Sequence, residues 1–561
     1  MRRAHPGDPR ISMDRSTDIP YRRIPGQSPL FLDYLDLAPA VLRFYGTPPS
    51  KQKLEDLAGN QLSKKTFPRN ELARILARQN ALYGAGADLQ EQIAEMARPD
   101  SVAVVTGQQV GLFGGPLYTV YKALTAMALA AELRERGIRA VPVFWMETED
   151  HDLAEATRLT RLRSDAPPET MEYNEALFGG AGPSRQPVGQ RILSFRIHKV
   201  TTDYLDSIPE SPFRGAVRGF LEQAYTPGVT MTQAFARLLR LLLPGLLLFD
   251  PGDPEAKRLA APVFRRALQD AGPISAAMRE RSRDLVDAGY HVQARIRENA
   301  PLLFCFRDGK RLAVERRPGG FGLRGSAHAF TPADLLRLTE NAPEQFSPNV
   351  LLRPLVQDFL FPTAAYVAGP SEIAYFAQVS PLYSLIDRPM PVIWPRNGFT
   401  LLEPELTAEL ERRGLVFEDC LAGRERMWEK GAPESPTELE SLERLERRLD
   451  CALEEIGAEI GTIEAGLTRA AAKARSKILH NLARLRAASL RRAEERRAYV
   501  QSSLDRMLAR CRPNGKLQER ELGILPYLAR CGPALIDRLR RETRPENFAH
   551  RVLHLEDPPP A

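Results

Sequence analysis

The sequence is poor in cysteine and has no long apolar run. Its 561 residues include five cysteines, an odd number, and no Cys-x-x-Cys pair. A disulfide framework or a zinc knuckle is therefore not expected, and reduced thiols in the cytoplasm fit better. No apolar segment approaches the roughly 18 residues of a membrane helix, and the N-terminal residues lack the apolar stretch of a secretory signal.

Histidine and net charge are also low. The eight histidines are scattered without a pair at helical metal-ligand spacing, so we expect no metal site. The net charge of +7 permits anionic ligands without requiring nucleic acid. With 43% hydrophobic and 27% charged residues the composition is that of a globular protein, and the length predicts two to four domains.

The most informative stretch is VVTGQQVGLFGGPLYTVYK, residues 104–122. It predicts a strand at 101–105, a loop of small and amide residues, and a helix over 117–136. A second strand at 140–146 leads into four polar, mostly acidic residues at 149–152. Because ligands bind at the carboxyl ends of the strands in open α/β sheets, both strand ends are candidate sites.

Similar patterns predict the other elements. Helices are expected within 30–100, and a buried parallel strand at 246–250 precedes a helix capped by Asp253. A second strand–loop–helix unit spans 359–386, after which 389–404 closes the sheet. Strand character outside this core is expected at 191–200 and in a β-meander over 290–330.

A coiled coil is expected from about residue 437 to 510, where proline is absent and leucine and isoleucine recur at 3–4 spacing. A single helix of this length would span roughly 110 Å. Gly457, Gly461 and Gly466 indicate instead an antiparallel hairpin that bends near them. The predicted organisation is a disordered tail at 1–27, a core at 28–436 with insertions at about 155–230 and 285–345, the hairpin at 437–510, and a helical segment at 511–561 that packs on the core.

Five motifs occur in order between residues 104 and 520: TGQQVGLFGGPLYTVYK, FWMETEDHD, LRPLVQDFLFPTAAYVAGPSEIAYFAQ, MPVIWPRNGFTLLE and PNGKLQER. Together they resemble the BshC family, the cysteine-adding ligases of bacillithiol synthesis. The resemblance implies an α/β fold with a Rossmann-like parallel-sheet core related to class I aminoacyl-tRNA synthetases, with connecting-peptide insertions and an α-helical coiled-coil domain that dimerises. It also implies a reaction that joins cysteine to glucosaminyl malate through an amide. The chain lacks the HIGH and KMSKS motifs of the synthetases, so an adenylate route is not supported residue by residue, and the N-terminal tail has no clear family counterpart.

The first motif supplies candidate substrate contacts. Its amides both donate and accept hydrogen bonds, and its glycines let backbone N–H groups approach a ligand. The candidates are Thr106, Gly107, Gln108, Gln109, Gly115 and Tyr118. Lys122 could neutralise a phosphate and is a candidate nucleotide contact. The alternative is a structural turn followed by a solvated lysine.

Glu149, Asp150, His151 and Asp152 are the candidate catalytic residues. Such a cluster could bind the ammonium group of cysteine, deprotonate an amine or hold Mg²⁺. The alternative is an N-cap at Asp152 with an acidic first turn for the following helix.

The loop AGPSEIAY supplies a further set of candidate substrate contacts, namely Gly369, Glu372 and Tyr375, with Ser371 as a candidate helix cap. Arg396 could pair with a carboxylate or phosphate through two hydrogen bonds. Its alternative role is a surface salt bridge.

The motif PNGKLQER contains three candidate nucleotide contacts, Asn514, Lys516 and Arg520. The family resemblance implies a nucleotide pocket between hairpin and core. The alternative, which we favour from the residues, is a turn and helix start that anchor the hairpin.

The sequence therefore predicts a cytoplasmic, homodimeric ligase that adds cysteine to glucosaminyl malate, with ATP and Mg²⁺ as candidate cofactors. One alternative is a nucleotidyl or acyl transferase of the same fold with another substrate. The other is a non-enzymatic coiled-coil scaffold or RNA-binding protein. The hairpin carries basic residues, but few aromatic residues accompany them, so nucleic-acid binding is not expected.

Overall fold

The computed structural model describes residues 16–84, 86, 89–161, 168–179, 186–431 and 437–556. The chain forms two compact units. The first comprises the chain up to Pro404, without residues 164–167, together with the residues from Pro513 onward, and the second is mainly Glu405–Arg512. Within the described ranges, no helix is both long and apolar enough to cross a membrane.

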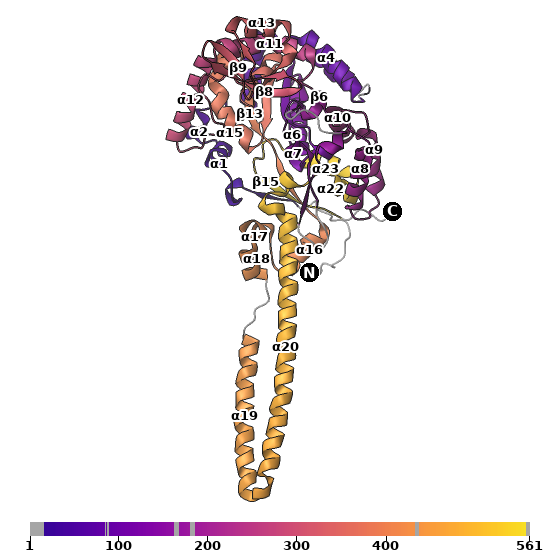
Figure 1. Ribbon diagram of the computed structural model, residues 1–561, viewed down its shortest axis with the longest axis vertical. Coiled ribbons are helices and arrows are strands. Elements are labelled where there is room, and N and C mark those ends of the chain that lie inside the picture. Colours follow the sequence, from indigo (N-terminus) through magenta and orange to yellow (C-terminus); the bar gives the residue numbers. More distant parts are fainter. Residues whose placement is uncertain are drawn as a thin grey trace, which may run out of the picture. The chain divides into compact units, whose positions relative to one another are not determined.

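A five-stranded parallel sheet is the centre of the first unit (Figure 1). The strands lie in the order β13-β12-β2-β3-β6, and each neighbouring pair is parallel. Their bounds are Val102–Gln109 (β2), Ala140–Glu147 (β3), Leu247–Phe249 (β6), Thr363–Ala368 (β12) and Val392–Pro395 (β13). The chain continues from β2 to β3 and β6 on one side and later adds β12 and β13 on the other. In such sheets the ligand crevice lies where the strand order reverses, here beside β2.

Strand β2 is longer than the sequence predicts. The expected strand ends at residue 105, whereas β2 continues to Gln109 because β3 pairs with it along its whole length, up to Gln109 opposite Glu147. Gly107 permits this close pairing, since a Cβ there would lie 2.8 Å from the Trp145 carbonyl oxygen. The amides of the first motif therefore stand on the strand end and not on a loop.

Two helices begin beside the sheet's carboxyl edge. Helix α6 (Leu117–Glu135) follows β2 and is buried along most of its length. Helix α15 (Pro370–Val379) follows β12 and has Gly369 at its N-cap, whose N–H donates to the Glu372 carboxylate at 2.7 Å. Ser371, the candidate cap, is not the cap, because the helix begins at Pro370 and Ser371 is its second residue.

The other helices of the core include those expected within 30–100, and the Asp253 cap is confirmed. Their bounds are Pro29–Leu35 (α1), Pro39–Leu42 (α2), Lys51–Asp56 (α3), Arg69–Leu82 (α4), Gln90–Met96 (α5), Met231–Leu242 (α10), Pro254–Gln269 (α11), Ala271–Asp287 (α12) and Arg353–Leu360 (α14).

The first insertion is mainly helical. Its described elements are Leu153–Thr157 (α7), Arg158–Arg161 (β4), Glu169–Glu172 (β5), Arg196–Asp206 (α8) and Arg214–Ala224 (α9). The strand predicted at 191–200 is wrong, because α8 occupies its second half. Ile197, Val200 and Tyr204 are buried at helical spacing, and this spacing outweighs the short alternation before it.

The second insertion contains an antiparallel sheet in the order β10-β9-β8-β7-β11. Its strands are Leu303–Arg307 (β7), Lys310–Arg317 (β8), Gly320–Leu323 (β9), Ala329–Phe330 (β10) and Phe346–Pro348 (β11), and Pro332–Asn341 (α13) packs beside it. The β-meander expected over 290–330 begins later than predicted, since residues 291–297 form no strand. The Gln378 side chain bonds the N–H and carbonyl of Ala294 at 2.8 and 2.9 Å, in place of a neighbouring strand.

A third sheet joins both ends of the described chain in the order β1-β15-β14. Residues 16–27, expected in the tail, instead begin with β1 (Ser16–Ile19), which is ordered because it pairs with β15 (His550–His554). Residues 389–404 do not all close the parallel sheet: β13 does, but β14 (Gly398–Leu402) pairs with β15. The C-terminal segment also contains Gln518–Glu521 (α21), Leu525–Cys531 (α22) and Ala534–Glu542 (α23). The rest of the predicted tail, residues 1–15, and the last residues, 557–561, lie outside the described residues.

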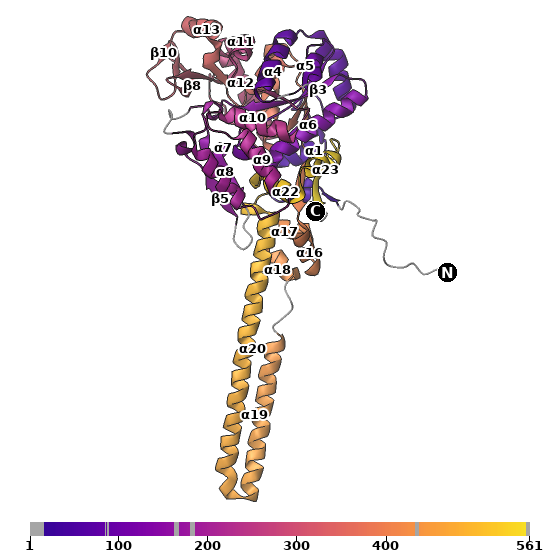
Figure 2. The same ribbon diagram turned by 90° about the vertical axis from the view of Figure 1, so that its right-hand side faces the viewer.

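The second unit is helical. Its helices are Pro404–Arg412 (α16), whose first residue still belongs to the first unit, Phe417–Ala422 (α17), Arg424–Gly431 (α18), Thr437–Ile463 (α19) and Thr468–Cys511 (α20). Helices α19 and α20 run side by side in Figures 1 and 2, with the bend at residues 464–467. The ion pairs Asp450–Arg475 at 2.6 Å and Glu446–Arg486 at 3.1 Å show that the two helices are antiparallel.

The loop after β3 is braced by Val188 and Gly189. Their N–H groups donate to the carbonyls of Asp150 and Thr148 at 2.7 and 3.0 Å. A Cβ on Gly189 would lie 2.5 Å from the Thr148 carbonyl oxygen. We therefore expect Gly189→Ala to lower the free energy of unfolding by about 1–3 kcal/mol in urea denaturation.

Gly215→Ala on α9 is the matched control, since no atom lies within 4 Å of its new Cβ. This variant should be neutral or more stable by about 0.5–1 kcal/mol, because alanine favours the helix. Equal stability of the two variants would contradict the bracing role of Gly189.

Candidate functional site

A cavity of about 620 Å³ lies at the carboxyl ends of β2, β3 and β12. The structure brings residues from every predicted site segment into its wall, although the segments are far apart in sequence. The predicted site residues that line it are Gly107, Gln108, Gln109, Tyr118, Lys122, Glu149, Asp150, His151, Gly369, Glu372, Tyr375, Arg396 and Arg520.

Five candidates do not line this cavity. Thr106 is fully buried within the sheet, where its hydroxyl donates to the Val367 carbonyl at 2.9 Å. Asp152 caps α7 by accepting the Glu155 N–H at 3.0 Å. Gly115 has a φ of +69° in the turn before α6, which explains the glycine without a ligand.

The remaining two, Asn514 and Lys516, bind one carboxylate. Their side chains donate to the two oxygens of Glu521 at 2.8 and 2.6 Å. These contacts fix the turn before α21. Arg520 is the residue of this motif that reaches the cavity.

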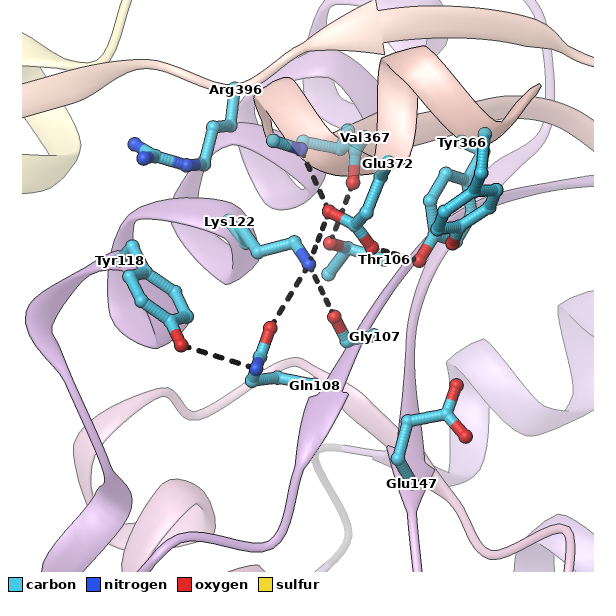
Figure 3. Close-up of polar contacts among 12 residues, drawn as sticks. Thr106, Gly107, Gln108, Tyr118, Lys122, Glu147, Tyr366, Val367, Glu372 and Arg396 are labelled. Carbon is cyan, nitrogen blue, oxygen red and sulfur yellow. Dashed lines mark hydrogen bonds and ion pairs between the residues drawn. The ribbon is translucent and has the colours of Figure 1, made fainter. Parts of the chain in front are cut away.

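Lys122 forms a buried ion pair at the centre of the site (Figure 3). Its side chain is 2% exposed, and Nζ lies 2.6 Å from Glu372 Oε2 and donates to the Gly107 carbonyl at 2.5 Å. It also donates to Gln108 Oε1 at 3.3 Å, and Gln108 in turn donates to the Tyr118 hydroxyl at 3.3 Å. Three acceptors thus surround the ammonium group. Lys122 is therefore buried and paired, and it is not a solvated lysine on the helix surface.

The other half of the pair is equally well held. Glu372 accepts the Tyr366 hydroxyl at 2.6 Å as well as the Gly369 N–H. Burial alone would raise the pKa of Glu372, but Lys122 and these donors outweigh it and hold the pKa below its usual value. Burial lowers the pKa of Lys122, although Glu372 opposes this. The Glu372 carboxylate therefore occupies the position at the start of α15 where an external anion could otherwise bind.

The acidic cluster after β3 divides among different partners. Glu149 is buried and accepts from Lys257 Nζ at 2.5 Å. Asp150 accepts from the Gln109 amide and from the His151 backbone N–H. His151 Nδ1 lies 3.6 Å from Asp150 Oδ1, and both side chains are partly exposed. Asp150 and His151 thus remain accessible from the cavity.

Arg396 is held by a buried carboxylate. Nη1 and Nη2 donate to the two oxygens of Glu519 at 2.9 and 2.5 Å. The pairing is bidentate, but it is internal and buried, neither a ligand contact nor a surface salt bridge. Arg396 lies over the Tyr118 ring at the cavity wall, with 5.8 Å between guanidinium carbon and ring centroid.

Four charged residues of the cavity are absent from the sequence-based candidates: Glu147, Glu155, Arg311 and Arg353. Glu147 ends β3, and Arg353 Nε lies 2.9 Å from its Oε1. Arg311 donates to the Ser347 hydroxyl and the Pro348 carbonyl at 3.0 and 2.8 Å. Glu147 and Arg353 stand inside the family motifs, which is the signal that could have found them, whereas nothing in the strand containing Arg311 distinguishes it.

Among the residues that the structure describes, no three His, Cys, Asp or Glu side chains form a group that could hold a metal ion. Three carboxylates of the cavity, Glu149, Glu372 and Glu147, are paired with Lys257, Lys122 and Arg353. We therefore assign no protein ligands to Mg²⁺.

The sheet, the polar cavity at its carboxyl edge and the helical hairpin define a two-unit α/β protein with a Rossmann-like ligand site. Residues 15–397 match the N-terminal Rossmann-like domain of BshC of bacillithiol biosynthesis, and residues 399–555 match its C-terminal coiled-coil domain. The chain belongs to the BshC family.

Relatives are similar over nearly their full length. The chain is 35% identical to a protein of Salinibacter ruber over 93% of its own length and 96% of the relative. It is 35% identical to a protein of Koribacter versatilis over 96% and 99%, and 29% identical to one of Bacillus cytotoxicus over 90% and 93%. Each of these relatives bears the name "Putative cysteine ligase BshC".

Lys122 and Glu372 form an ion pair in the protein interior, so removal of one charge should leave the other without its partner. We expect Lys122→Met to lower the free energy of unfolding by about 3–5 kcal/mol in chemical denaturation. The double variant Lys122→Met/Glu372→Gln should recover much of this loss. Strictly additive losses in this double-mutant cycle would contradict the coupling of the pair.

Proposed function

We propose that this protein is a ligase that joins the carboxyl group of cysteine to the amino group of glucosaminyl malate. The observation that carries the proposal is the cavity of about 620 Å³, which presents carboxylates and cations within one space. Both substrates combine ammonium, carboxylate and other polar groups, and such a wall suits them. All five cysteines are free thiols, which suits the reducing cytoplasm in which we place the reaction.

In this proposal, different residues of the cavity bind different groups of the substrates. Asp150 and His151 face the amino group of a substrate, and Gln109 orients Asp150. Arg311 and Arg520 offer positive charge to the carboxylates of the malyl group. Gln108 and Tyr118 offer hydrogen bonds to hydroxyl groups.

Formation of an amide from a carboxylate is unfavourable in water and requires an activated acyl group. We include a nucleoside triphosphate, with ATP and Mg²⁺ as the first choice, as the activator. Its phosphates should not bind between Lys122 and the start of α15, because the Glu372 carboxylate occupies that position. Kinship with the class I aminoacyl-tRNA synthetases stays a prediction.

The ligase activity is tested by incubating the full chain with cysteine and glucosaminyl malate, with ATP, GTP or no nucleotide, in the presence of Mg²⁺. We expect the condensed thiol in mass spectrometry when the activating nucleotide is present. Absence of product under every nucleotide condition, with protein folded by circular dichroism, would reject the proposed function.

His151→Ala tests the assignment of the β3 loop. Loss of a hydrogen bond to a charged substrate group should lower kcat/KM about 10- to 100-fold. His198→Ala, at an exposed position of α8, is the matched control and should keep native kinetics. Unchanged kinetics in both variants would remove His151 from the site.

We also propose that the hairpin forms a homodimer. Several apolar side chains of α19 and α20 are exposed within this unit, including Leu445 at 56% and Leu485 at 66%. Side chains of this kind at 3–4 spacing typically pack against another helix pair. A second copy of the chain presents the same apolar row.

Light scattering and sedimentation at micromolar concentration should therefore show a dimer. The variant Leu445→Glu/Leu485→Glu should be monomeric, because it places charges in the apolar row. Thr462→Glu, which adds a charge near the bend, is the control and should stay dimeric. A monomeric native protein would contradict the proposal.

A further inference from the structure

Glu147 is a cavity carboxylate with one fixed and one open oxygen. It is the last residue of β3, and 30% of its side chain is exposed. Arg353 Nε lies 2.9 Å from Oε1, and among the described residues no hydrogen bond to Oε2 is formed. The structure therefore holds one oxygen while the other remains available to a ligand in the cavity.

Arg353 is itself fixed in orientation. Its side chain is 5% exposed, and Nη1 donates to Gln357 Oε1 at 2.9 Å. Nη2 donates to the hydroxyls of Tyr375 and Tyr366 at 2.7 and 3.1 Å. A planar guanidinium with all three nitrogens engaged has little freedom, so the carboxylate beside Nε is positioned before substrate arrives.

Three other carboxylates of the cavity, Glu149, Glu372 and Asp150, already have partners within the fold. Lys257 neutralises Glu149, Lys122 neutralises Glu372, and Asp150 accepts from Gln109 and from a backbone N–H. Each of these contacts stabilises the carboxylate as an acceptor within the fold. Glu147 differs from Glu149, which is also paired through one oxygen, in its exposure: 30% of the Glu147 side chain is exposed, against 8% for Glu149.

We infer that Glu147 is the proton acceptor for the attacking amine and that Arg353 is its positioning residue. The inference rests on the proposed function. The substrate ammonium transfers one proton to the Glu147 carboxylate, giving a neutral amine and a carboxylic acid. The amine nitrogen forms a bond to the acyl carbon of activated cysteine, and the carbon–oxygen bond to the phosphate-type leaving group breaks with its electron pair. The second amine proton leaves with that group, and Glu147 returns its proton to water.

Several charged groups face Glu147 and set its titration. Burial raises the pKa of Glu147 to about 7; Asp150 and Glu149 act in the same direction, and Arg353 and Arg311 act against it. The other titratable groups around Arg353 are Tyr366, Tyr375 and Glu372. Below about pH 7 Glu147 is protonated and cannot accept, so the rate should fall as the pH falls.

The test measures kcat and kcat/KM for glucosaminyl malate between about pH 5.5 and 9, the range that brackets a base of this strength. The native protein should show an acid limb near pH 7. Glu147→Gln should lower kcat about 100-fold or more and abolish the limb, since the amide cannot accept the proton. Glu344→Gln, at an exposed position of the second insertion, is the matched control and should keep the native profile.

Two further variants separate the alternatives. His151→Ala should retain the acid limb, whereas a limb that came from His151 would vanish in it. Arg353→Gln should move the limb to higher pH, because it removes the cation that lowers the pKa of Glu147; a purely structural arginine would leave the limb in place.

A limb that persists in a folded Glu147→Gln variant would come from the substrate ammonium and would overturn the inference. Native protein that forms product without an acid limb would overturn it too, whether or not the variants fold. Native protein that forms no product at any pH or with any nucleotide would reject the proposed function itself.

Discussion

The ion pair between Lys122 and Glu372 is the interaction on which the rest of the site depends. Lys122 belongs to the helix after β2 and Glu372 to the helix after β12, so the pair spans the point where the strand order reverses. Each buried charge requires the other, because an unpaired charge there would be strongly destabilising. The ion pair thereby connects the ends of β2 and β12 and the helices that follow them, at the base of the cavity.

The same ion pair limits which ligands can bind at the start of α15. A helix start with a nearby lysine is a common place for phosphate, but here the Glu372 carboxylate already takes the Gly369 N–H and the Lys122 ammonium. A phosphate at this position would meet a negative charge. Anion binding is therefore left to cations on other walls, such as Arg311 and Arg520. The site is suited to small polar molecules with groups of both signs.

Local patterns in the sequence predicted the elements that local physics determines. The apolar run at 140–146 is β3, and Asp253 caps α11, because burial and capping act within a few residues. The failures have distant causes. The end of β2 depends on the backbone of β3, residues 16–19 become a strand by pairing with β15, and Gln378 replaces the strand expected at 291–297. The cavity wall was foreseen in part, since strand ends collect at one edge, but the partner of each charge lies far along the chain.

Those distant partners explain why one acidic motif contains residues with different roles. In sequence, Glu147, Glu149, Asp150 and Asp152 are equivalent carboxylates within six positions. In the fold, Lys257 neutralises Glu149, the start of α7 uses Asp152, and Gln109 orients Asp150. Arg353 holds a single oxygen of Glu147 and leaves it in a poorly solvated place, where burial raises its pKa towards neutrality. The chemistry of each carboxylate is thus decided by the element that packs against it, and the motif alone cannot assign the proton acceptor.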